Sequence, residues 1–157
     1  MKRMIAAVFS AVVLLGLFGR PMTASAADSG SAAGVVVTAV GGLNVRTAAA
    51  KDASIVTTLL KGSHVTLISK SGIWWKVEYG KNRYGFCHSD YIRRISGTAV
   101  SVHTSSGSLN VRIGPGTGYA KQGSLYKGET VIELSTSGGW SKILYHGTKT
   151  GYVSAQY

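Results

Sequence analysis

A gapless duplication limits what this chain can fold into more than any other feature of its sequence. The segment Leu43–Arg46 (Leu-Asn-Val-Arg) returns as Leu109–Arg112, 66 positions later. At that offset, residues 34–91 and residues 100–157 share 19 identities in 58 positions. The repeated residues include Lys61, Gly62, Trp74, Lys76, Tyr79, Gly85 and Tyr91. Self-similarity at a fixed offset indicates a repeated structural unit, so we expect two copies of one small fold.

Each copy consists of short apolar segments separated by glycine-containing turns. Leu43 and Val45 alternate with Asn44 and Arg46, so a period of two places the apolar pair on the core face and the polar pair on the other face. Similar segments recur at short intervals, without a convincing amphipathic helix. This pattern predicts an all-β fold of two tandem small antiparallel barrels.

Residues 1–26 have the layout of a secretory signal peptide. Lys2 and Arg3 precede the apolar run Met4–Phe18, and Ala24–Ala26 offers a small-x-small cleavage site. The alternative, an uncleaved membrane anchor, needs about 20 apolar residues, and this run is shorter. We therefore expect secretion to the cell envelope or beyond, with residues 27–33 as a flexible leader and no stable membrane anchor after cleavage.

The chain that remains after cleavage is basic. Removal of residues 1–26 leaves 14 lysines and arginines against 6 acidic residues, a net charge of +8. Such a charge favours anionic partners, namely wall polymers, membrane surfaces or nucleic acid. Export argues against nucleic acid, and the basic residues are scattered apart from Arg93-Arg94. The alternative is that the charge only keeps the surface solvated.

The motifs of the two copies resemble the bacterial SH3 domain family (SH3b). The resemblance rests on the Leu-Asn-Val-Arg strand, the Lys-Gly turn, the loop Gly114–Tyr119, the segment Ser137–Ile143 and the closing Gly151–Tyr157. It implies SH3-like barrels, which we assign to residues 34–96 and 98–157. It also implies a role in targeting exported proteins to the bacterial cell wall, where several relatives bind the peptide part of peptidoglycan.

The first copy departs from the family pattern in one loop. Where the second copy has Ile113–Tyr119, the first has Thr47–Ala53, without the proline, the glycines or the aromatic residue. If this loop helps to form a ligand groove, the first copy binds differently or only supports the second.

Surface aromatic and polar residues are the candidate ligand-binding set. Aromatic rings supply flat amphipathic faces, while Arg can pair with a carboxylate and Asn with an extended backbone. The candidates are Asn110, Arg112, Tyr119, Tyr126, Trp140 and Tyr152 in the second copy, and Asn44, Arg46, Trp75 and Tyr84 in the first. The alternatives are that the two asparagines hold turns by hydrogen bonds, and that the duplicated Trp74 and Trp140 belong to the core.

We expect no catalytic, metal or cofactor site. Cys87 and His88 are neighbours on a predicted strand, so their side chains point to opposite faces. Cys87 aligns with the apolar Val153, which favours a buried inert thiol over a reactive one. The four histidines are not repeated and show no ligand spacing.

Two hypotheses about function follow. The first is a secreted, non-catalytic protein that binds peptidoglycan or an associated anionic wall polymer. The alternative is an interaction module that binds or regulates a separate envelope protein, such as a wall hydrolase.

Overall fold

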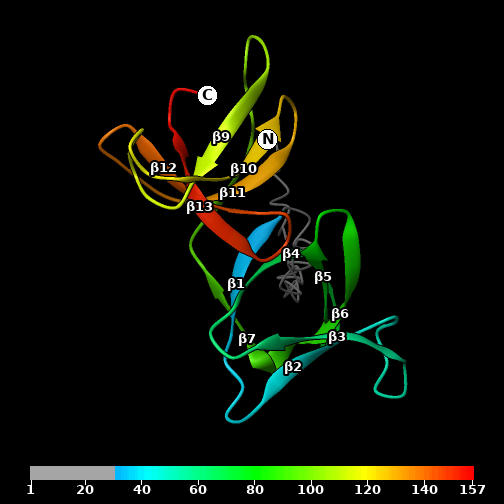
Figure 1. Ribbon diagram of the computed structural model, residues 1–157. Coiled ribbons are helices and arrows are strands. Elements are labelled where there is room, and N and C mark those ends of the chain that lie inside the picture. The colour runs from blue at the N-terminus through cyan, green and yellow to red at the C-terminus, as the bar shows by residue number, and fades with distance from the viewer. Residues whose placement is uncertain (1–30) are drawn as a thin grey trace, which may run out of the picture.

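The computed structural model describes residues 31–157, so the predicted signal peptide and most of the predicted leader lie outside the described residues. Residues 32–95 form a seven-stranded sheet, here called barrel 1, and residues 98–154 form a six-stranded sheet, barrel 2 (Figure 1). All strand pairs are antiparallel. The predicted fold class, two tandem small antiparallel barrels, is confirmed.

The first six strands of barrel 1 correspond one to one to the six strands of barrel 2. Barrel 1 contains β1 (Ala32–Val36), β2 (Gly42–Arg46), β3 (Ile55–Leu60), β4 (His64–Ser71), β5 (Trp74–Gly80), β6 (Arg83–His88), the 3-10 turn η1 (Ser89–Tyr91) and β7 (Ile92–Ile95). Barrel 2 contains β8 (Thr98–Ser101), β9 (Ser108–Arg112), β10 (Lys121–Tyr126), β11 (Thr130–Ser137), β12 (Trp140–Tyr145) and β13 (Lys149–Ser154). Each strand from β8 to β13 begins at the offset of the sequence repeat from its counterpart among β1 to β6.

The six corresponding strands follow the same order in both sheets, and barrel 1 has the additional strand β7 at one edge. The order runs β3-β2-β6-β5-β4-β1-β7 in barrel 1 and β10-β9-β13-β12-β11-β8 in barrel 2. In barrel 1 the strand β7 covers the outer edge of β1, pairing Ile95 with Ala33 and Ile92 with Val36. Because Ala33 is fully buried in β1, the predicted flexible leader ends too late: residues 32 and 33 belong to the barrel.

Period-two alternation builds each core. In β2 and β9 the leucine and valine are buried while the asparagine and arginine are partly exposed, as predicted. Val45, Val65, Val77 and Cys87 are completely buried in barrel 1. Val111, Leu125 and Ile143 are likewise buried in barrel 2. Each barrel therefore has its own hydrophobic core.

The turn between β12 and β13 ties barrel 2 to barrel 1. The backbone N–H and the hydroxyl of Thr66 both donate to the carbonyl oxygen of Gly147, at 2.8 and 3.1 Å. Figure 1 shows this turn reaching β4. Beside it, a small buried cluster joins Ala33 of barrel 1 to Ile132 and Leu144 of barrel 2. Backbone hydrogen bonds and apolar packing thus act together at the contact.

Candidate ligand-binding grooves

Two surface hollows occupy equivalent places on the two barrels. Groove 1, of about 530 Å³, lies on barrel 1 among Leu43, Asn44, Arg46, Trp74, His88 and Tyr91. Groove 2, of about 430 Å³, lies on barrel 2 among Leu109, Asn110, Arg112, Trp140, Ser154 and Tyr157. Every residue that lines groove 1 has its counterpart, at the offset of the repeat, in the lining of groove 2. The duplication has therefore preserved a surface feature as well as a fold.

Trp74, His88 and Tyr91 form an aromatic wall in groove 1. β5 and β6 pair Trp74 directly with His88, whose ring contacts the Trp74 ring edge-on at 5.5 Å between centroids. η1 then turns the chain so that the Tyr91 ring lies 5.6 Å from the His88 ring. Tyr91 is 48% exposed, so much of its ring remains available to a ligand. Trp74 itself is half-buried.

The two arginines hold the loops that border the grooves. In groove 1, Nη1 of Arg46 donates to the carbonyl oxygen of Ala53 at 2.7 Å. In groove 2, Nη1 of Arg112 donates to the carbonyl oxygen of Tyr119 at 2.6 Å. Ala53 and Tyr119 are themselves equivalent positions. A guanidinium has five N–H donors, so this structural bond uses only part of the capacity with which each arginine could bind a carboxylate.

The asparagines occupy equivalent places in the two grooves. Asn44 accepts a hydrogen bond from the Thr58 hydroxyl at 3.2 Å, across the β2–β3 pair. This bond links two strands, so Asn44 supports the hairpin while its side chain lines groove 1. Asn110 lines groove 2 at the matching place.

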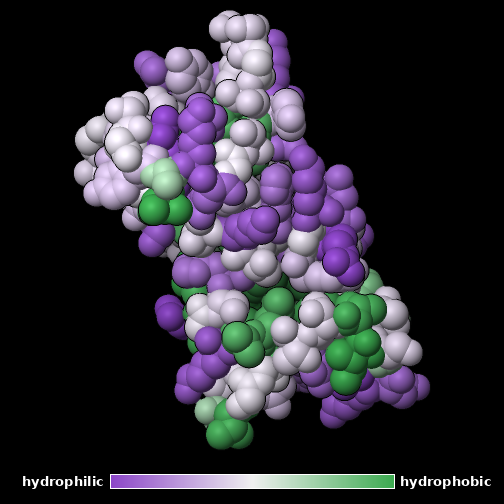
Figure 2. Space-filling model, viewed as in Figure 1, coloured by the Kyte–Doolittle hydropathy of each residue, from purple (hydrophilic) through white to green (hydrophobic). Residues whose placement is uncertain are grey.

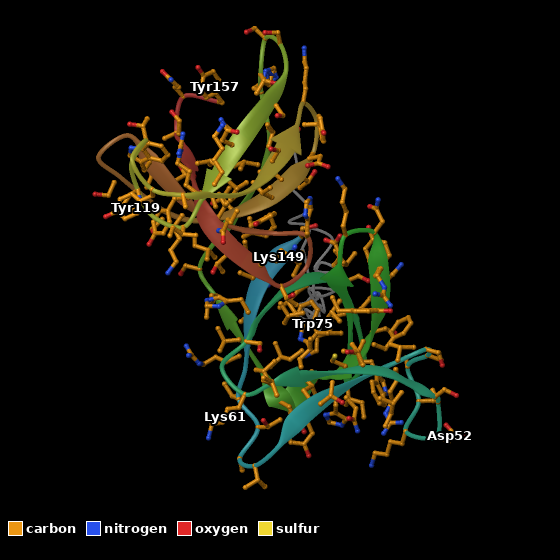
Figure 3. The ribbon with its side chains drawn as sticks, viewed as in Figure 1. Asp52, Lys61, Trp75, Tyr119, Lys149 and Tyr157 are labelled. Atoms are coloured by element: carbon orange, nitrogen blue, oxygen red, sulfur yellow. The ribbon has the colours of Figure 1, made fainter. Side chains whose placement is uncertain are left out.

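The glycine-rich loop of barrel 2 packs on its own tyrosine. A Cβ atom at Gly114 would lie 2.4 Å from the Tyr119 ring, and one at Gly116 would lie 3.3 Å from it. The glycines therefore make room for the ring, which is 49% exposed beside the groove (Figure 3). In barrel 2 the loop is closed by a hydrogen bond from the Ile113 N–H to the Ala120 carbonyl. Barrel 1 lacks the glycines and the tyrosine, yet its loop is closed by the equivalent bond, from the Thr47 N–H to the Ser54 carbonyl.

The structure brings five of the ten predicted site residues into the grooves. These are Asn44 and Arg46 in groove 1 and Asn110, Arg112 and Trp140 in groove 2. Tyr119 and Tyr152 lie outside the groove lining, Tyr119 on its loop and Tyr152 in β13 opposite Arg112. Their role in binding stays a prediction.

Trp75 is placed differently from the prediction. It is only 6% exposed and belongs to the core of barrel 1 (Figure 3), because neighbouring residues on β5 point to opposite faces. A ligand at the surface has no access to most of its ring. Trp74 is the tryptophan of this pair that faces the surface. Its presence in both copies had favoured a core position instead.

Tyr84 and Tyr126 lie near the contact between the barrels. A hollow of about 580 Å³ between the barrels includes Tyr84 in its lining, and the amine of Lys76 lies 5.4 Å above the Tyr84 ring. The amine of Lys81 is 5.8 Å from the Tyr126 ring and forms an ion pair with Glu129. Lys81 comes from barrel 1 and Glu129 from barrel 2. Both tyrosines therefore belong to the surroundings of this contact, and neither lines groove 1 or groove 2.

Glu129 is the electrostatic centre of the contact between the barrels. Burial raises the pKa of Glu129, but hydrogen bonds from Lys81 and from the Tyr126 N–H, with the charges of Lys81 and His146, outweigh burial and lower it overall. Nε2 of His146 lies 3.6 Å from the Glu129 carboxylate, too far for a hydrogen bond. The carboxylate is thus held in its charged form between groups from both barrels.

Trp74, His88, Tyr91 and Tyr157 are groove residues outside the predicted set. Identity in both copies could have identified Trp74 and Tyr91, since one tryptophan of Trp74-Trp75 has to face outward on a strand. However, a residue is also repeated in both copies when it packs in the core, so repetition alone does not distinguish a groove residue from a core residue. His88 joins the groove only because the β5–β6 register sets it opposite Trp74, and no sequence motif carries that information.

Cys87 is a buried thiol, as predicted. It has no exposed surface, and burial raises its pKa to about 12. The thiolate, which is the reactive form, is therefore scarce at neutral pH.

Within residues 31–157, no group of three or more histidine, cysteine or acidic side chains is placed to hold a metal ion. The same range contains no helix long and apolar enough to cross a membrane.

Comparison with known proteins places the duplicated unit in a family. The family model described as "Bacterial SH3 domain" matches residues 41–93 and again residues 107–157. The Bacillus subtilis (strain 168) protein named "Putative N-acetylmuramoyl-L-alanine amidase YrvJ" is 29% identical over 134 residues, 81% of this chain and 26% of that protein. The chain thus spans about a quarter of the length of this relative.

Two solved structures show weaker similarity. NlpC2 from Trichomonas vaginalis is 16% identical with a TM-score of 0.40, over 80% of this chain and 46% of that one. NlpC1 from the same organism is also 16% identical with a TM-score of 0.40, over 79% of this chain and 44% of that one.

Proposed function

Because the chain belongs to the bacterial SH3 domain family, we propose that it is a secreted, non-catalytic protein that binds the bacterial cell wall through grooves 1 and 2. The ligand is peptidoglycan or an anionic polymer associated with it. The observation that carries the proposal is the pair of grooves with equivalent linings. The similarity to part of a protein named as an N-acetylmuramoyl-L-alanine amidase supports a role at the wall.

The groove chemistry fits a binding role. Each groove combines partly exposed aromatic rings with an asparagine and an arginine, which is the mixture of flat apolar faces and a few polar groups that fixes an extended ligand. Such aromatic and arginine residues are those that contribute most to binding at protein surfaces. The buried Cys87, with its raised pKa, is unsuited to nucleophilic catalysis.

The arrangement of the grooves favours a polymeric ligand. Figure 1 shows β2 and β9, the strands that carry Arg46 and Arg112, at opposite ends of the molecule. Two weak sites on one molecule gain effective concentration when the ligand repeats along a polymer. A wall polymer presents such repeats, so two modest grooves are enough for firm attachment.

Co-sedimentation with insoluble peptidoglycan tests the proposal. Purified protein is mixed with peptidoglycan either carrying or stripped of its anionic polymers, at low and high salt. We expect the Trp74→Ala/Trp140→Ala double variant to lose at least roughly tenfold in affinity, since each truncation removes a central aromatic contact. Loss of wild-type binding on stripping would identify the anionic polymer as the ligand, and weaker binding at high salt would show that charge contributes to binding.

Tyr126→Ala is the matched control, because Tyr126 is an exposed aromatic residue outside both grooves. It should bind like the wild type. Wild-type binding by the double variant would overturn the assignment of the grooves, and failure of the wild-type protein to sediment with either preparation would overturn the proposed function. Circular dichroism melting curves confirm that each variant is folded.

A second candidate function is suggested by the surface of barrel 1. Its outer strand β3 exposes Ile55, Val56 and Leu60, whose counterparts in barrel 2 are Lys121, Gln122 and Tyr126. Figure 2 shows hydrophobic side chains gathered over barrel 1, whereas barrel 2 is mainly hydrophilic on the same face. Exposed apolar patches often mark protein interfaces. Capture of an envelope protein by the wild type but not by an Ile55→Lys/Leu60→Lys variant would support an interaction module.

A further inference from the structure

We propose that the two grooves select different chemical groups: groove 1 a ligand with a free carboxylate, and groove 2 an uncharged saccharide. This inference rests on the proposed function, because it assigns a ligand class to each of the grooves through which the protein binds the wall. Such a division would let one molecule contact both the peptide and the glycan of a polymer built from the two.

Five of the equivalent lining pairs differ in the same direction, and Gln156 lines groove 2 although its counterpart Asp90 is outside the lining of groove 1. Six of the equivalent pairs are identical. The other five place Ser105, Ser106, Ser108, Thr117 and Ser154 in groove 2 where groove 1 has Ala39, Val40, Gly42, Lys51 and His88. Each of these five changes places a hydroxyl where groove 1 has an apolar side chain, a glycine, a lysine or a histidine. Five changes toward one functional group indicate a change in ligand rather than drift of a solvated surface.

Groove 1 has the chemistry of an anion site. Arg46, Lys51 and His88 all line it, and none of the described residues in its lining is acidic. The carboxylate of Asp90, which is 3.7 Å from Nδ1 of His88, lies outside the lining. Arg46 can pair with a carboxylate through two parallel N–H bonds, and Lys51 adds a mobile charge from the adjoining loop.

Groove 2 has the chemistry of a saccharide site. Trp140 offers a partly exposed ring on which the apolar face of a sugar can lie, and the surrounding serines and threonines are both donors and acceptors, as sugar hydroxyls require. Arg112 is the one basic residue of the described lining. Its Nη1 donates to the Tyr119 carbonyl just as Nη1 of Arg46 donates to the Ala53 carbonyl, so the difference in charge between the grooves comes from Lys51 and His88.

An unsatisfied hydroxyl in groove 2 supplies an independent sign of a missing partner. Thr104 lines the groove, is 7% exposed, and its Oγ1 is buried without a hydrogen-bond partner. The equivalent hydroxyl of Thr38 in groove 1 donates to the Gly41 carbonyl at 3.1 Å. A buried hydroxyl without a partner costs free energy, so such a group is normally completed by a ligand or a water molecule. A hydroxyl of a bound ligand could complete the hydrogen bonding of Thr104 in groove 2. In groove 1 the equivalent Thr38 hydroxyl already has a partner.

Two soluble probes test the division by NMR titration of the ¹⁵N-labelled protein. One is an uncharged β-1,4-linked N-acetylglucosamine trisaccharide. The other is an N-acetylated tripeptide with a free C-terminal carboxylate, compared with its C-terminal amide. We expect the trisaccharide to shift the indole N–H signal of Trp140 and the acid tripeptide to shift that of Trp74. The amide should bind groove 1 roughly fivefold more weakly, which is the size of one exposed ion pair.

Exchange of two lining residues between the grooves sharpens the test. In the first variant, Lys51→Thr/His88→Ser gives groove 1 two hydroxyls from groove 2; in the second, Thr117→Lys/Ser154→His does the reverse. We expect the first to lose roughly fivefold in affinity for the acid tripeptide while its trisaccharide binding at Trp140 is unchanged. The second should gain tripeptide binding at Trp140. The exposed single variant Lys51→Gln checks the charge without changing the aromatic wall.

The outcomes separate this inference from the function on which it rests. Equal binding of both probes in one groove, preferences that do not follow the exchanged residues, or no binding of either probe while the protein still sediments with the wall would overturn the division alone. Failure of the wild-type protein to bind the wall in any form would overturn the proposed function as well.

Discussion

The hairpin β4–β5 of barrel 1 and its counterpart β11–β12 in barrel 2 share a register but are held by different interactions. In barrel 1, Leu67 and Trp75 are buried, and the Lys70 amine lies 5.8 Å from the Trp75 ring. At the three equivalent positions, barrel 2 has Glu133, Thr136 and Ser141. There the Glu133 carboxylate accepts hydrogen bonds from both hydroxyls.

The three positions have changed as a set. Lys70 pairs with Trp75 across the strands, as Thr136 pairs with Ser141, and both hairpins shift register at the same step, before Ser69 and before Ser135. A backbone frame can thus remain constant while an apolar and aromatic contact is exchanged for a hydrogen-bonded carboxylate. Exchange of one member alone would bury a charge without partners or leave a void.

Loss of Trp75 should have the largest effect. Trp75→Ser removes a buried ring and leaves a cavity, so we expect the free energy of unfolding of barrel 1 to fall by about 3–5 kcal/mol, measured in urea. Transfer of the whole barrel 2 set (Leu67→Glu/Lys70→Thr/Trp75→Ser) should be less damaging than the sum of the single variants, because the hydroxyls then satisfy the carboxylate. Strict additivity would show that the set is not an interacting unit.

Gly147→Ala should have the next largest effect. Gly147 lies in the turn between β12 and β13, which contacts barrel 1, and the added methyl group would break this contact between the barrels. Gly147 has a φ of +85°, and a Cβ atom there would lie within 2.8 Å of the backbone of Glu78, Tyr79 and Gly80. We expect a loss of about 2–3 kcal/mol and greater mobility between the barrels, measured by thermal unfolding and by NMR relaxation.

Gly62→Ala is its control. Gly62 has a φ of +81° with nothing within 4 Å of the added methyl group, so it should cost only the strain of a left-handed residue, about 1 kcal/mol. Equal losses for the two variants would mean that the Gly147 contact adds nothing beyond local strain.

The carboxylate of barrel 2 should make its hairpin sensitive to acid. Hydrogen bonds from Ser141 and then Thr136 hold the pKa of Glu133 below its ordinary value. Folding therefore favours the charged form, and this stabilisation is complete above the ordinary glutamate pKa of about 4.3 and is lost as the pH falls through the lowered folded value.

Glu133→Gln should thus cost roughly 1 kcal/mol at pH 6, and the difference from the wild type should disappear in acid. Urea unfolding followed by the signals of barrel 2 measures it. A difference that does not change with pH would show that the hydroxyls stabilise the side chain without regard to its charge.

The ion pair between the barrels should have the smallest effect. The side chains of Lys81 and Glu129 are 49% and 22% exposed, so Lys81→Gln should lower the free energy of unfolding by less than about 1 kcal/mol. The loss should shrink in concentrated salt, where exposed charges are screened. A larger loss that is independent of salt would mean that Lys81 acts through packing on Tyr126 rather than through its charge.

Much of the fold was accessible from the sequence, because a gapless repeat transfers the start of each strand from β1 to β6 to its counterpart in the second copy. The sequence also predicted that Asn44 and Arg46 face outward, because apolar and polar residues alternate along this strand. The faces of Trp74 and Trp75 did not follow, since alternation says only that they differ. Which of them lies inside depends on the contacts of β5 with Leu67 and its neighbours, and these depend on the register of paired strands.

Each strand from β1 to β6 begins at the same offset from its counterpart in barrel 2, and this common offset has a consequence for recombination. A crossover between the two copies within one gene would add or remove one whole repeat and still produce hybrid barrels with intact strand pairing. Only crossovers between positions 67 and 75 would separate the members of the interacting set and join Leu67 to Ser141 or Glu133 to Trp75. The repeat can therefore expand or contract readily at its turns, while this one hairpin has to be inherited as a block.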